Sequence, residues 1–117
     1  MPISISDLAE KATEQIYKRE PQLLERFGEQ GKNKCKEDNE HHLKQLKTAF
    51  ELDNHQFFVE YAIWLNGILT KHGMGTKHLV DNFQILEGLL KSSDQLEENE
   101  LNAYLDYIDR AIRALDS

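Results

Sequence analysis

The sequence DNHQFFVEYAIWLNGILTKH, residues 53–72, decides the fold of this chain. Its apolar residues recur every three or four positions, which is the spacing of one face of an α-helix. Val59, Ala62 and Ile63 carry apolar character round to the other side, and a helix that is apolar most of the way round is enclosed by its neighbours. We therefore predict a central, buried helix over about residues 54–72. Its main stripe contains Phe57, Phe58, Tyr61, Trp64, Leu65, Ile68 and Leu69.

Helical spacing also recurs on both sides of this segment, and no run alternates with the period of a half-buried strand. The loops between the helices are short, so no domain boundary is expected. The predicted fold class is all-α, a single domain over residues 1–117 that forms a bundle of five or six helices. The further helices are expected at about residues 4–19, 21–27, 33–52, 77–90 and 101–115.

Several residues are expected to begin or end these helices. Ser4 or Ser6 is placed to cap the first one. Gly31 is expected to end the short second helix. Asp53, with Gln56 three residues later, has the arrangement of a capping box for the central helix. The first two turns of the helix at 33–52 are almost wholly polar, so we expect them to project into solvent or to fray.

Gly73 follows the central helix and is expected to end it in the left-handed conformation. Two histidines flank this turn, and they can face one another across the ends of two antiparallel helices. A haem-binding interpretation places one of them against the aromatic stripe. The alternative is that His72 lies in a last helical turn, where its protonated form meets the negative end of the helix dipole.

Composition excludes several classes of function. The formal net charge of −7 opposes binding to nucleic acid and to anionic membrane surfaces. No run of about 18 apolar residues is present, and the N-terminus has no features of a leader peptide. The single Cys35 cannot form an internal disulfide, which is typical of a protein in the reducing cytoplasm. We expect a soluble cytoplasmic protein with no nucleic-acid or membrane partner.

No catalytic or metal-binding motif is present. The histidines have neither the Glu-x-x-His spacing of di-metal bundles nor the His-Glu-x-x-His spacing of zinc helices. Cys35 lies between two lysines, which favours a thiolate, but no His/Asn constellation supports nucleophilic catalysis. We therefore expect no enzyme activity, no metal and no cofactor, and we interpret Cys35 as incidental.

The aromatic stripe of the central helix is larger than a minimal core requires. Aromatic side chains anchor both ligands and protein partners, so part of the stripe can line a pocket or an interface. The candidate ligand-binding residues from the sequence are Phe57, Phe58, Tyr61, Trp64, His72 and His78.

Residues 41–90 carry a resemblance to a known type of domain. A Leu-rich helix leads through a short acidic turn to Phe-x-x-Tyr-x-x-Trp-Leu, a Gly-containing turn and another Leu-rich helix. This pattern resembles the helical domains that precede cobalamin-binding modules in bacterial sensors and regulators, and it implies a helical sensory or interaction module. Met74 and Gly75 stand where light-sensing members have a Glu-His pair that helps to hold cobalamin. The matching residues are Leu43, Leu46, Ala49, Phe58, Tyr61, Trp64, Leu65, Gly73, Phe83, Leu86 and Leu90.

Two functions from different classes follow. The leading one is a non-enzymatic interaction or regulatory module that binds a protein partner or a second copy of itself, because the last helix has a heptad-like apolar pattern suited to a dimer. The alternative is a sensory domain that binds a small hydrophobic or tetrapyrrole-type ligand against the aromatic residues of the central helix.

Overall fold

Five helices are formed between residues 4 and 116, the part of the chain that this computed structural model describes. No strand occurs within that range, and the helices pack into one globule, so the predicted all-α fold class is confirmed. No helix among these residues is both long and apolar enough to cross a membrane. The helices are α1 (Ile5–Arg19), α2 (Gln22–Leu52), α3 (His55–Lys71), α4 (Thr76–Ser92) and α5 (Glu98–Asp116).

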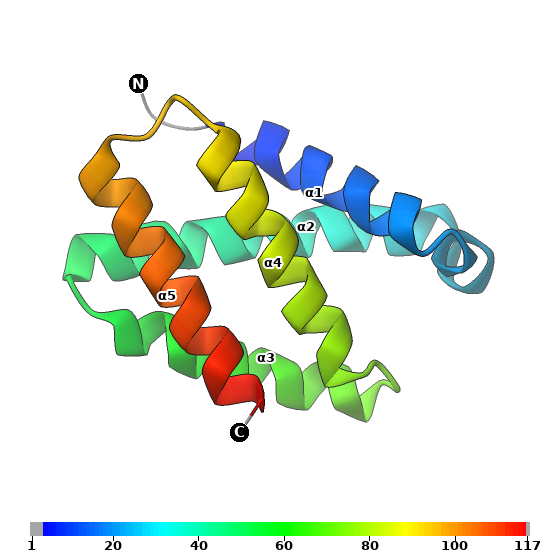
Figure 1. Cartoon of the computed structure of the whole chain (residues 1–117). Helices are drawn as coiled ribbons and strands as arrows, with labels where there is room; N and C mark the ends of the chain where they lie inside the picture. The colour runs from blue at the N-terminus through cyan, green and yellow to red at the C-terminus, as the bar shows by residue number, and fades with distance from the viewer. Residues whose placement is uncertain (1–3, 117) are drawn as a thin grey trace.

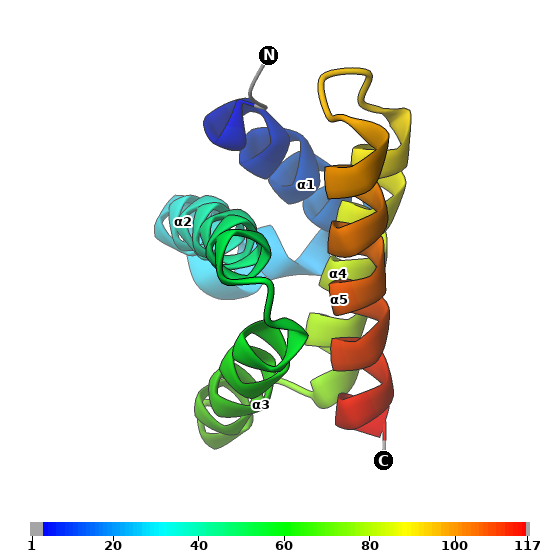
Figure 2. The ribbon, with the colours of Figure 1, turned by 90° about the vertical axis from the view of Figure 1, so that its left-hand side faces the viewer.

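The helices form two layers. α4 and α5 lie side by side and cross over a second layer that contains α1, α2 and α3 (Figure 1). The turned view shows α4 and α5 together on one side, with α2 and α3 on the other (Figure 2). The core lies between these layers because each helix turns its apolar stripe toward the other layer. Its largest fully buried apolar side chains are Leu43, Leu46, Phe58, Leu79, Phe83, Leu86, Leu90, Tyr104 and Ile108.

A kink divides α2 near its start. Gly28 has φ 68° and ψ −170°, a conformation that is accessible essentially only to glycine. After the kink the chain passes so close to the preceding turn that a Cβ on Gly31 would lie 2.4 Å from the Cβ of Phe27. The prediction that Gly31 ends a separate helix is therefore wrong. Gly28 supplies the break, and Gly31 allows the close approach.

The helix ends follow the predicted chemistry with one change of residue. Ser4 caps α1 by accepting a hydrogen bond from the Asp7 amide, as expected. Asp53 is not the N-cap of α3: it is the C-cap of α2, in the left-handed conformation with φ 51°. Asn54 caps α3 instead, because its side-chain oxygen accepts a hydrogen bond of 3.0 Å from the backbone N–H of Gln56. Gly73 has φ 86°, which confirms its predicted role as a left-handed terminator.

The position of α3 differs from the expectation of a helix enclosed on several sides. Only Phe58, Val59 and Ala62 of α3 are buried, and this side packs toward α5. Ile63 is 50% exposed and Trp64 is 63% exposed. The expectation that Trp64 lies in the core is therefore wrong, because α3 lies at the edge of its layer and has no neighbour on that side among the described residues.

Candidate ligand-binding site

A cavity of about 290 Å³ lies where α1, α2, α3 and the start of α4 meet. Leu65, Ile68 and Leu69 of α3 form an apolar wall. Leu23 and Phe27, which precede the Gly28 kink, line it from α2. Most of its lining is therefore hydrocarbon, as in most small-molecule sites.

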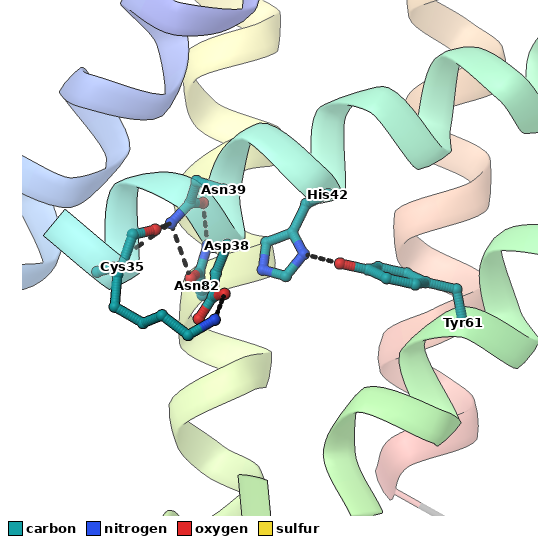
Figure 3. Close-up of polar contacts among 7 residues, drawn as sticks. Cys35, Asp38, Asn39, His42, Tyr61 and Asn82 are labelled. Atoms are coloured by element: carbon teal, nitrogen blue, oxygen red, sulfur yellow. Dashed lines mark hydrogen bonds and ion pairs between the residues drawn. The ribbon is translucent and has the colours of Figure 1, made fainter. Parts of the chain in front are cut away.

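Two chemically active side chains of α2 line this cavity one helical turn apart. The thiol of Cys35 is half-buried, and burial raises its pKa to about 11, so the thiol is protonated at neutral pH. Asp38 carries a carboxylate that accepts a hydrogen bond of 2.9 Å from Lys34, whose side chain is mostly exposed. The cavity thus combines apolar walls with a thiol and a carboxylate. Both polar groups come from α2, on which Figure 3 labels Cys35 and Asp38.

A pair of buried amides holds this part of α2 against α4. Asn82 donates a hydrogen bond of 2.6 Å to the Oδ1 of Asn39, and Asn39 donates one of 3.2 Å in return. The same Asn39 Nδ2 donates to the Cys35 carbonyl at 3.0 Å and lies 3.7 Å from its Sγ. Because a buried amide without partners is costly, this reciprocal pair fixes the register of the two helices next to Cys35 (Figure 3).

A buried histidine also lines the cavity. The Nδ1 of His42 lies 2.7 Å from the hydroxyl oxygen of Tyr61 on α3, and the ring meets Phe83 edge-on with centroids 5.2 Å apart. Burial, together with the charges of His41 and His78, lowers the pKa of His42 to about 3. Burial raises the pKa of Tyr61, so this hydrogen bond joins two neutral groups.

The structure brings together only some of the residues proposed from the sequence. His72 and His78 both line the cavity, and burial lowers the pKa of His78. Tyr61 does not line the cavity, but its hydroxyl is hydrogen-bonded to His42, which does. The other three lie elsewhere: Phe58 belongs to the core, Phe57 packs against it, and Trp64 is on the surface with its ring 6.4 Å from that of Tyr61.

Sequence reasoning missed the polar part of the site because it interpreted the first turns of the helix at 33–52 as solvated. Cys35, Asn39 and His42 are spaced by four and three residues, so they share one face. That face is half-buried or buried: Cys35 and His42 line the cavity, and Asn39 between them is bonded to Asn82. The spacing of these three residues could have indicated from the sequence that this face of the helix is buried. No cluster of three or more metal-binding side chains occurs between residues 4 and 116.

Comparison with known proteins gives one clear result. A model of the family described as "Phycobilisome protein" matches residues 3–115. No significant similarity was found to any curated protein or to any solved structure.

The family match corrects the functional expectation. It overturns the interpretation of the chain as a generic interaction or regulatory module, because the proteins of this family are light-harvesting proteins that bind bilins. It confirms a helical domain but gives no support to the resemblance to domains that precede cobalamin-binding modules. The sequence-based error arose because the matched residues 41–90 are mostly core types, which many helical domains share. Since nearly the whole chain is matched, this chain belongs to the phycobilisome protein family.

Proposed function

We propose that this protein is a non-enzymatic pigment-binding protein that holds a bilin, an open-chain tetrapyrrole, in the cavity beside Cys35. The observation that carries the proposal is the combination of thiol, carboxylate and apolar wall in one cavity of a phycobilisome-family chain. The tetrapyrrole-binding alternative from the sequence is thereby retained. The proposed binding site is no longer the aromatic stripe of α3 but the cavity between α2 and α3.

The residues of the cavity fit the chemistry of such a pigment. An open-chain tetrapyrrole has a flat conjugated framework, N–H groups in its middle and two carboxylates on its edge. Leu65, Ile68 and Leu69 offer an apolar surface to the framework, and the Asp38 carboxylate is an acceptor for N–H groups. The exposed ammonium of Lys34 donates one hydrogen bond to Asp38 and has further N–H groups for a pigment carboxylate at the edge of the site.

The size of the cavity sets how the pigment is held. Its volume of about 290 Å³ is just below the range of roughly 300–1,000 Å³ that is usual for ligand pockets. A molecule as long as a tetrapyrrole would therefore lie partly outside it. A bound pigment supplies absorption of visible light, and the protein's contribution is to fix its conformation and exclude water from one side.

Cys35 gives the site a means of covalent attachment. Its thiol would add across an exocyclic carbon–carbon double bond: a carbon–sulfur bond forms, the π bond breaks, and the thiol proton passes to the neighbouring carbon. This addition needs no oxidant or reductant. Because burial keeps the thiol protonated at neutral pH, we expect attachment to be slower than non-covalent binding and to accelerate at higher pH.

Self-association and a cytoplasmic location are further parts of this proposal. Phycobilisome proteins assemble into oligomers, which supports a second copy of the chain or a related protein as partner. The exposed Ile63 and Trp64 of α3 are apolar side chains available to such a partner.

The test uses biliverdin as the pigment and the full-length purified protein. Binding is expected to sharpen and shift the visible absorbance, and incubation at raised pH is expected to leave pigment attached after denaturing electrophoresis. Cys35→Ser should abolish attachment but keep reversible binding, whereas Asp38→Asn should weaken binding. Glu37→Gln, an exposed neighbour on the same helix, is the matched control. A wild-type protein whose addition leaves the biliverdin spectrum unchanged would overturn the proposed function.

A further inference from the structure

One nitrogen of the buried His42 ring has no role in the fold. Nδ1 is engaged by the Tyr61 hydroxyl, and within residues 4–116 no hydrogen bond is made by Nε2. His42 nevertheless lines the cavity, although the residue as a whole is only 1% exposed. Figure 3 shows this second nitrogen directed away from Tyr61, to the side on which Asp38 lies.

The bond to Tyr61 decides which His42 nitrogen carries the proton. Both groups are neutral, because burial lowers the pKa of His42 and raises that of Tyr61. A phenol is a stronger acid than a neutral imidazole N–H, and an imidazole nitrogen is a stronger base than a phenol oxygen. Tyr61 O–H therefore donates to Nδ1, which leaves the proton on Nε2. His42 therefore presents an N–H donor to the cavity.

This donor is buried, unlike the Lys34 ammonium, which is mostly exposed at the edge of the same cavity. Asp38 is an acceptor, and the Asn39 and Asn82 amides are occupied by one another. The imidazole is also held rigidly, because its ring meets Phe83 and Tyr61 edge-on at 5.2 and 5.8 Å between centroids. A rigid donor in an apolar cavity selects a ligand that brings an acceptor to it, since otherwise the ligand would desolvate the N–H without a partner.

We infer that His42 is a specificity-determining residue that donates its Nε2–H to a carbonyl oxygen of the ligand, with Tyr61 as the positioning residue that sets this tautomer. The inference rests on the proposed function and deepens it. An open-chain tetrapyrrole ends in two rings that carry carbonyl oxygens, whereas a cyclic porphyrin has none. Both carry two carboxylates, so His42 distinguishes them by the carbonyl and not by charge.

The experiment compares two pigments on the apo protein. Biliverdin and protoporphyrin IX are titrated separately, with quenching of the exposed Trp64 as the signal. His42→Phe keeps a ring against Phe83 but removes both nitrogens, and it is expected to weaken biliverdin binding by roughly three- to tenfold with protoporphyrin binding unchanged. Tyr61→Phe keeps the imidazole but frees its tautomer, so it is expected to weaken biliverdin binding less. His55→Gln, on an exposed histidine outside the cavity, is the matched control and should match the wild type.

A second measurement needs no ligand. Long-range ¹H–¹⁵N spectra of the apo protein should show His42 protonated at Nε2 in the wild type, and a mixture of tautomers in Tyr61→Phe. Protonation at Nδ1 in the wild type would overturn the inference. Equal weakening of both pigments by His42→Phe would also overturn it, because this would indicate loss of packing alone. A wild type that binds neither pigment would overturn the proposed function together with the inference.

Discussion

The buried neutral His42 should make the protein lose stability in mild acid. The ordinary imidazole pKa of 6.5 applies to the unfolded chain, and the folded protein holds the pKa near 3. Between these two pKa values, the imidazole is protonated in the unfolded chain but neutral in the folded protein. Lowering the pH therefore favours unfolding. The stabilisation is fully present above about pH 6.5 and is lost as the pH falls toward 3.

The magnitude follows from the two pKa values. Each pH unit in this window changes the unfolding free energy by about 1.4 kcal/mol, because one pKa unit corresponds to that energy. Going from pH 7 to pH 5 therefore costs about 2 kcal/mol through His42 alone. For a small domain this is a substantial part of a total stability of roughly 5–15 kcal/mol.

The assay compares urea unfolding of the wild type and His42→Phe at pH 7, 6 and 5. Carboxylates and other histidines titrate in both proteins, so the difference between the two pH profiles isolates His42. The wild type should lose about 2 kcal/mol more than His42→Phe over this interval. Parallel profiles would refute the placement of a neutral imidazole in a desolvated site, whatever the stability of either protein at pH 7.

Two further predictions concern packing and the amide pair. Phe58→Ala is expected to cost about 3–5 kcal/mol because the ring is fully buried, whereas Trp64→Ala should cost less than about 1 kcal/mol; equal losses in urea melts would contradict the placement of these rings. Asn39→Ala or Asn82→Ala should each lower the free energy of unfolding by about 1–3 kcal/mol, because the remaining amide loses its hydrogen-bond partner. The double variant should lose less than the sum of the two single losses. A strictly additive double-mutant cycle would show that the pair is not coupled.

Much of the fold was predictable from local chemistry. Ser4 caps its helix and Gly73 ends another, because such roles depend on a few adjacent residues. The spacing of apolar residues gave the positions of all five helices between residues 4 and 116, with the start of α2 divided at the wrong glycine. The choice between Asp53 and Asn54 as the cap was not predictable, since both residue types serve well and only the path of the chain decides.

The site was much less predictable than the helices. The apolar residues of α3 extend most of the way round, but the sequence does not say which side a neighbour covers, and Trp64 proved to be on the open side. The polar turns around Cys35 and His42 resembled a solvated surface because their burial comes from α1, α3 and α4, which are distant in sequence. A cavity is a gap between several helices, and periodicity within one helix carries no information about it.

The kink at Gly28 divides α2 into two segments with different neighbours. Residues 22–27 lie on one side of a single glycine, and the long straight part of α2 lies on the other. Leu23 and Phe27, on the first side, line one wall of the cavity, whereas Asn39, on the second side, pairs with Asn82 of α4. If the cavity holds a pigment as proposed, the apolar wall before the glycine would shape the space around the pigment and Cys35 after the glycine would attach it, so the two roles fall on separate segments of α2.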